Sequence, residues 1–135
     1  MATIIVRIER SKDGAYWLNS EGLQNVLVGT GSTIEEAKED FRLCLQDMID
    51  SYTECGEAVP EELKDLEFEY RYDTASVLTA VSKYISLSAL AKETGINASL
   101  LRQYKQGQYI SAAQAQKIQS GIRSMSKRIA SFTLL

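Results

Sequence analysis

The chain has 135 residues, 44% of them apolar and 24% charged, with a formal net charge of −3 at pH 7. This composition supports one domain or two small ones with a packed core and argues against a disordered chain. No apolar run approaches the roughly 20 residues that span a bilayer, and MATIIVRIER at the N-terminus lacks the pattern of a signal peptide. We therefore expect a soluble, cytoplasmic protein without a membrane partner.

Charge is distributed unevenly along the chain. Residues 1–65 contain 6 Lys/Arg and 14 Asp/Glu (net −8), whereas residues 66–135 contain 9 and 4 (net +5). Such asymmetry indicates one half that meets phosphate and one half that avoids it or attracts a basic protein. Two ordinary solvated surfaces are the alternative explanation.

The N-terminal segment has the pattern of three short strands. β-Branched residues alternate over Thr3–Glu9, and the alternation resumes over residues 15–19 after the turn pair Asp13-Gly14. A third apolar segment, Asn25–Thr30, follows after a break. We expect these segments to form a small antiparallel sheet.

A long amphipathic helix is predicted over residues 33–55. Thr33 and Glu36 have the spacing of a capping box, and Gly56 ends the pattern. The apolar residues recur at three- and four-residue steps on one face: Ile34, Ala37, Phe41, Cys44, Leu45, Met48 and Tyr52. This single helix is expected to cover the sheet, which gives a small α+β domain over residues 1–60.

The two cysteines, Cys44 and Cys55, do not have the pattern of a metal site. The chain contains no histidine that could complete a zinc site. We expect Cys44 to pack in the core and Cys55 to be a free thiol. No metal and no cofactor are expected.

These N-terminal motifs resemble the HicB antitoxin family. The shared pattern comprises Asp13-Gly14-Ala15-Tyr16, then GTGSTIEEA over residues 29–37, and Val59-Pro60 after the helix. The resemblance implies a partial ribonuclease-H-like domain that binds a small HicA-like toxin, a ribonuclease that cleaves mRNA, and neutralises it. In many members a DNA-binding domain follows.

One segment departs from the family pattern. Residues 19–24 (NSEGLQ) stand where family members commonly have a Pro-Asp-rich loop. Either the toxin-facing surface therefore differs from that of other members, or the chain is a solitary HicB-like transcriptional regulator without a toxin partner.

After a linker at residues 61–65, we expect a second domain over residues 66–135. Clean alternation predicts a strand over Leu66–Tyr72, and residues 129–135 have the composition of another. Between them an all-α domain is expected, with helices over residues 74–84 and from residue 112 onward. Because two-stranded edges are marginal, we expect the flanking strands to pair with each other or across a homodimer or higher even oligomer.

The segment Ser86–Gly107 has the pattern of a helix-turn-helix. Ser86 and Asn97 are typical N-caps of helices over residues 87–94 and 98–106, and Gly95 suits a left-handed turn. The segment resembles the lambda-repressor/Cro type, in which a glycine, eleven residues and a second glycine frame the turn and the recognition helix. A helical hairpin that only packs is the alternative.

That resemblance assigns DNA contacts to particular residues. Ser99 and Gln103 would face bases, with help from Arg102. Phosphate contacts are expected from a second group: Asn97, Lys105, Tyr109 and Ser111. In a homodimer, two such helices would bind the half-sites of an inverted-repeat operator, roughly 34 Å apart.

The resulting hypothesis is an antitoxin that neutralises a small ribonuclease toxin and represses its own operon by binding operator DNA. We do not expect an enzyme, because without histidine no Ser-His-Asp or Cys-His arrangement can form. A vestigial magnesium-dependent nuclease is the enzymatic alternative, although the acidic residues fall mostly along one helix.

Overall fold

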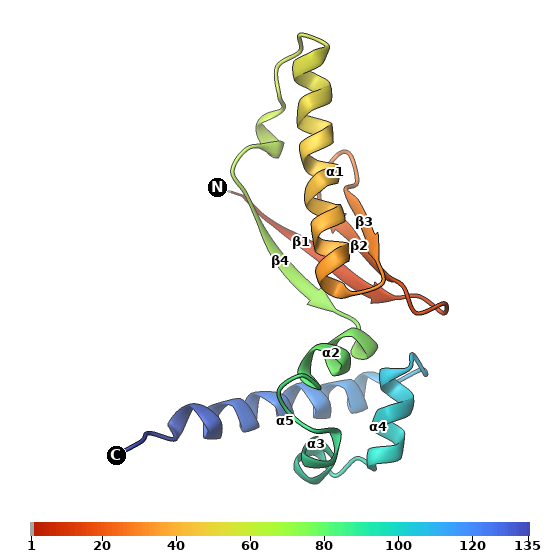
Figure 1. Cartoon of the computed structure of the whole chain (residues 1–135), viewed down its shortest axis with the longest axis vertical. Helices are drawn as coiled ribbons and strands as arrows, with labels where there is room; N and C mark the ends of the chain where they lie inside the picture. The colour runs from red at the N-terminus through yellow and green to blue at the C-terminus, as the bar shows by residue number, and fades with distance from the viewer. Residues whose placement is uncertain (1) are drawn as a thin grey trace. The chain divides into compact units, whose positions relative to one another are not determined.

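The computed structural model describes residues 2–135, which divide into two compact units. The first unit runs to Ser76, and the second comprises Val77–Leu135. A sheet and one long helix make up the body of the first unit, whereas the second consists of helices (Figure 1). The expected α+β class is confirmed.

The sheet has four strands in the order β3-β2-β1-β4. β1 (Ala2–Arg10), β2 (Tyr16–Glu21) and β3 (Val28–Gly31) run antiparallel, as the sequence predicts. β4 (Leu66–Tyr72) pairs with β1 in parallel at the other edge. The sheet is therefore mixed and not wholly antiparallel, because the long connection from β3 to β4 returns the chain in the direction of β1.

The turn between β1 and β2 uses the Asp-Gly pair. Gly14 has a left-handed φ of 89°, and its N–H donates to the Ser11 carbonyl at 3.0 Å. The Asp13 carboxylate accepts hydrogen bonds from the Ser11 hydroxyl and from the Ala15 N–H. These two bonds, the one from Ser11 above all, lower the pKa of Asp13.

Helix α1 (Ile34–Glu54) begins at the expected cap. Thr33 Oγ1 accepts the Glu36 N–H at 3.1 Å, while Glu36 Oε2 accepts the Ser32 N–H at 3.0 Å. The carboxylate thus closes the box on Ser32, one residue before the capping threonine. Hydrogen bonds from the Ser32 hydroxyl and N–H lower the pKa of Glu36.

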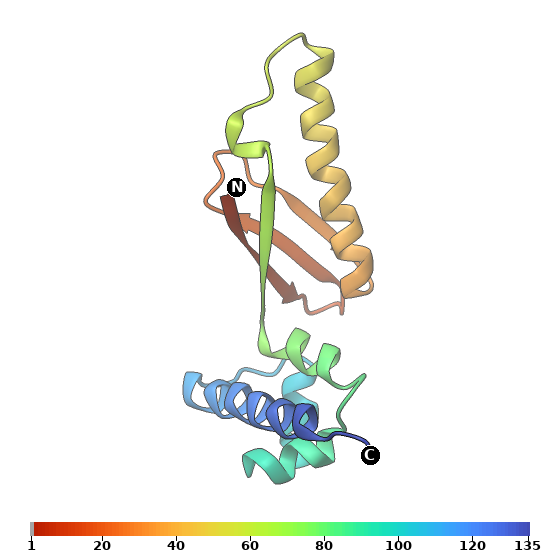
Figure 2. The ribbon, with the colours of Figure 1, turned by 90° about the vertical axis from the view of Figure 1, so that its left-hand side faces the viewer.

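α1 lies on one face of the sheet, as the two ribbon views show (Figures 1 and 2). The approach to β3 is close, since a Cβ added at Gly29 would lie 2.5 Å from the Phe41 nitrogen. One added at Gly31 would lie 2.7 Å from the Ala37 nitrogen. Only glycine leaves room for a helix backbone at these two positions.

The core of the first unit lies between α1 and the sheet. The Phe41 ring meets the Phe68 ring edge-on with a centroid distance of 5.2 Å. Lys38 Nζ lies 4.3 Å from the centre of the Tyr70 ring. Cys44, expected in this core, is only half-buried because the stripe of α1 extends past its buried residues Ile34, Ala37 and Phe41.

The two strands expected to flank the helical domain do not both form, and the one that forms does not flank that domain. Leu66–Tyr72 is a strand, but it belongs to the sheet of the first unit. Residues 129–131 continue a helix, and residues 132–135 have no regular structure. Local alternation and composition can indicate an extended segment but not its partner.

The boundary between the units lies after Ser76, and residues 61–65 do not separate them. Glu61–Leu63 forms a short 3-10 helix in which Leu63 is buried. The Asp73 carboxylate then accepts the Arg10 N–H at 2.8 Å and the Ser76 N–H at 2.9 Å. Asp73 therefore joins the end of β1 to the start of α2 (Thr74–Val81).

The second unit contains α3 (Leu87–Thr94), α4 (Ala98–Lys105) and α5 (Ala112–Ser131) together with most of α2. Its buried core takes residues from all four helices and from the α3–α4 turn: Leu78, Leu90, Ile96, Leu101, Tyr104 and Ile118. Four of these residues, Leu90, Ile96, Leu101 and Tyr104, come from the segment Ser86–Gly107.

Candidate nucleic-acid interface

Helices α3 and α4 are joined by a turn of three residues, Gly95, Ile96 and Asn97. Gly95 adopts the left-handed conformation with a φ of 75°, and its N–H donates to the Ala91 carbonyl at 2.9 Å. Ile96 points into the core and is 5% exposed. The turn is therefore fixed both by its backbone and by a buried anchor.

Side-chain caps define where each helix begins. Ser86 Oγ accepts the Ala89 N–H at 3.0 Å, and Asn97 Oδ1 accepts the Ser99 N–H at 2.7 Å. Both caps were predicted from the sequence and are confirmed. Thr94 adds a further constraint, because its hydroxyl donates to the Leu90 carbonyl and accepts the Ile96 N–H.

One face of α4 is left exposed. Ser99, Arg102 and Gln103 lie at three- and four-residue steps on this face, opposite the buried Leu101 and Tyr104. Arg102 Nη2 donates to Ser99 Oγ at 3.1 Å. These three expected base-contacting residues are thus brought together on one helix surface.

The four expected phosphate-contacting residues lie around α4. Asn97 and Ser111 are both caps, Ser111 Oγ accepting the Gln114 N–H at 3.2 Å at the start of α5. Lys105 is half-buried in the last turn of α4, and Tyr109 in the next connection is 85% exposed. Gln106, the C-cap of α4, is exposed as well. Its position three residues after Gln103 is the one sequence signal that points to a DNA contact there.

The second unit is strongly basic. Residues 77–135 contain 8 Lys/Arg and 1 Asp/Glu, a net charge of +7. The one acidic residue, Glu93 at the end of α3, pairs with Arg128 of α5 at 2.6 Å. This ion pair, with Ser124, lowers the pKa of Glu93.

α5 supports α3 through a close contact at Gly121. A Cβ at this position would lie 2.6 Å from Thr94 Cγ2. Together with the Glu93–Arg128 pair, this contact holds the two helices at a fixed separation. The helix α4 that carries the exposed face shares a buried core with α2, α3 and α5.

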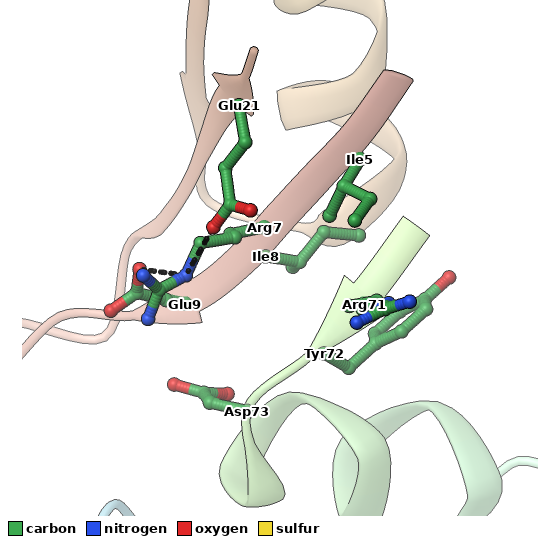
Figure 3. Close-up of a pocket in the computed structure, with 8 residues that line it drawn as sticks. All are labelled: Ile5, Arg7, Ile8, Glu9, Glu21, Arg71, Tyr72 and Asp73. Atoms are coloured by element: carbon green, nitrogen blue, oxygen red, sulfur yellow. Dashed lines mark ion pairs between the residues drawn. The ribbon is translucent and has the colours of Figure 1, made fainter. Parts of the chain in front are cut away.

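In the first unit, a pocket of about 310 Å³ lies where β1 and β4 end. Figure 3 shows Arg7 between the carboxylates of Glu9 and Glu21, with Arg71 and Asp73 across the pocket. Arg7 Nε lies 3.4 Å from Glu9 and 3.6 Å from Glu21. A second hollow, of about 410 Å³, lies along the last turns of α1 beside Met48 and Tyr52.

Among residues 2–135, no group of three or more His, Cys, Asp or Glu side chains is placed to hold a metal ion. None of the described helices is both long and apolar enough to cross a membrane. No family model, curated protein or solved structure matches this chain.

Proposed function

We propose that the chain is a HicB-like antitoxin that binds operator DNA through its second unit and a small basic toxin through its first. The observation that carries the DNA-binding half is the exposed face of α4. Ser99, Arg102 and Gln103 occupy one surface of a short helix that follows a fixed three-residue turn, in a unit of net charge +7. This arrangement suits a recognition helix in the major groove.

In this proposal Ser99 and Gln103 contact base edges. Gln103 can bond an adenine edge through both its amide oxygen and its amide nitrogen. Arg102 already donates to Ser99, so it positions Ser99 and has further N–H groups for a base or a phosphate. Asn97 uses its amide oxygen as a cap, which leaves its NH₂ group for a phosphate.

The expected homodimer is also part of the proposal, although one strand that was to form it belongs to the sheet of the first unit and the other is not formed. α5 and its C-cap Phe132 carry apolar residues at steps of four and three: Ile118, Ile122, Met125, Ile129 and Phe132. Ile118 is buried in the core, whereas Ile129 is 55% and Phe132 80% exposed. Steps of four and three are typical of the apolar seam between two packed helices. In a homodimer, α5 of the second copy would cover the exposed end of this seam, at Ile129 and Phe132.

The toxin-binding half is supported by charge. Residues 1–76 contain 7 Lys/Arg and 17 Asp/Glu, a net charge of −10, which favours a basic protein partner. The solitary regulator is the second candidate, because residues 19–24 depart from the family pattern for a toxin-binding member.

The experiment is to purify the full chain with the protein encoded by the adjacent short open reading frame. We expect a basic protein that cleaves mRNA alone and is inactive with one equivalent of the chain. Specific DNA binding without any such complex would support the solitary regulator instead. Magnesium-dependent RNA cleavage by the chain itself would contradict both.

A further inference from the structure

The sheet of the first unit has one face without a helix of that unit against it (Figure 2). We call this the open sheet face, and it is formed by the strand residues that point away from α1. The register places Trp17 beside Glu9 on one side and Thr30 on the other, while Arg7 lies opposite Asn19 and Arg71. Such faces are normally polar where they meet water.

The β2–β3 side of the open sheet face instead carries exposed apolar side chains. Trp17 is 44% exposed and Val28 on the neighbouring strand is 43% exposed. They are diagonal neighbours across β2 and β3, since Trp17 pairs with Thr30 and Asn19 pairs with Val28. Single exposed apolar residues are common on soluble proteins, but a tryptophan grouped with a second apolar side chain indicates a binding surface.

Charged residues lie beside this apolar pair on β1, β4 and the end of β2, and carboxylates outnumber guanidinium groups. Arg7 is bound by Glu9 and Glu21, and Arg71 lies 3.5 Å from Glu69. The face carries two arginines and four glutamates, the fourth being Glu67 beside Thr3. Each guanidinium group is thus compensated within the face, and the surplus charge is negative.

We propose that the open sheet face is the surface that binds a basic protein, with Trp17 in the contact. This inference rests on the toxin-binding half of the proposed function and adds to it the place of contact. The pocket at the ends of β1 and β4 borders the same face, and its polar lining combines the carboxylates of Glu9, Glu21 and Asp73 with the guanidinium groups of Arg7 and Arg71 (Figure 3).

Charge decides between possible occupants of the face. The first unit of a second copy would bring another net charge of −10 against the face, and nucleic acid would bring phosphates. Both are repelled by surplus carboxylates. A basic protein gains from the same charges, and its apolar side chains can cover Trp17 and Val28.

The test uses Trp17 as a reporter, because it is the only tryptophan of the chain. The full chain is titrated with the basic protein of the adjacent open reading frame, and any emission of that protein is subtracted. We expect the Trp17 emission to shift to shorter wavelength as the complex forms. An unchanged emission with a formed complex would overturn the proposal while leaving the proposed function intact.

Variants give a second readout by calorimetry. Trp17→Thr is expected to weaken the complex at least tenfold and Val28→Thr several-fold, since a few residues, tryptophan prominent among them, contribute most of the affinity of an interface. Leu43→Gln is the matched control, because Leu43 is 47% exposed on α1, and it should change affinity less than twofold.

The remaining outcomes separate the alternatives. Loss of binding in Met48→Gln or Tyr52→Ser, with Trp17→Thr unaffected, would place the partner on α1 and overturn the proposal. A Trp17 shift that depends only on chain concentration, or only on added DNA, would also overturn it. No complex even with the unaltered chain would contradict the toxin-binding half of the proposed function itself.

Discussion

At the scale of single residues, Gly29 determines how closely α1 lies on the sheet. We expect Gly29→Ala to lower the free energy of unfolding by about 3 kcal/mol or more. The new Cβ would lie 2.5 Å from the Phe41 nitrogen, a backbone atom that cannot rotate away. Chemical denaturation followed by circular dichroism measures this loss.

Gly22→Ala is the matched control for that experiment. Gly22 has a φ of 91° but nothing within 4 Å of an added Cβ. Its substitution should therefore cost only the left-handed conformation, roughly 1–2 kcal/mol. Equal losses for the two variants would contradict the close approach of α1 to β3.

Gln103 and Lys105 are expected to act differently on DNA. Gln103→Ala should relax base preference at one position of each half-site, at a cost of roughly 1–3 kcal/mol. Lys105→Ala should instead weaken binding to all sequences evenly and flatten the salt dependence. Competition between matched and single-base-altered DNA duplexes distinguishes the two effects. If Gln103→Ala weakened every duplex equally, its assignment to a base edge would be wrong.

At the scale of elements, the exposed end of α5 is the surface that the proposed dimer would bury. The account predicts a dimer of twice the 15.0 kDa chain at micromolar concentration. The double substitution Ile129→Ser with Phe132→Ser should shift the mass measured by light scattering to one chain, because it removes the exposed end of the apolar seam. Tyr84→Ser, at a residue 86% exposed, is the control and should leave the dimer intact. A monomer already in the unaltered chain would contradict this part of the account.

The elements also show which features could be predicted from the sequence. The caps at Ser86 and Asn97 and the left-handed Gly95 depend on neighbouring residues, so the turn between α3 and α4 was predicted in detail. The strand at Leu66–Tyr72 was predicted as well, but its parallel partner β1 was not. Strand pairing is set by contacts between distant segments, and alternation gives no information about them.

The exposure of Trp17 could not be predicted from the sequence, because it also depends on contacts between distant segments. Alternation around Trp17 predicts that Tyr16 and Leu18 share the opposite face. It does not tell which face α1 will cover, so the exposure of Trp17 became evident only in the fold. The expected strand over residues 129–135 failed because the helical seam from Ile118 continues through Ile129.

At the scale of the whole molecule, the division into units coincides with a division of charge. The first unit has a net charge of −10 and the second of +7, so a modest total of −3 is the sum of two units of opposite charge. We expect salt to affect both proposed activities, DNA binding by the second unit and partner binding by the first. Added salt should weaken DNA binding through the second unit and slow partner association with the first.

The central claim is that the second unit binds a symmetric operator. Footprinting the full chain on the DNA directly upstream of its own gene, with an excess of unrelated DNA present, tests it most directly. The account predicts two protected half-sites related by a two-fold axis, with centres roughly 34 Å apart. Protection that is uniform along the fragment, or that unrelated DNA removes equally well, would contradict the account.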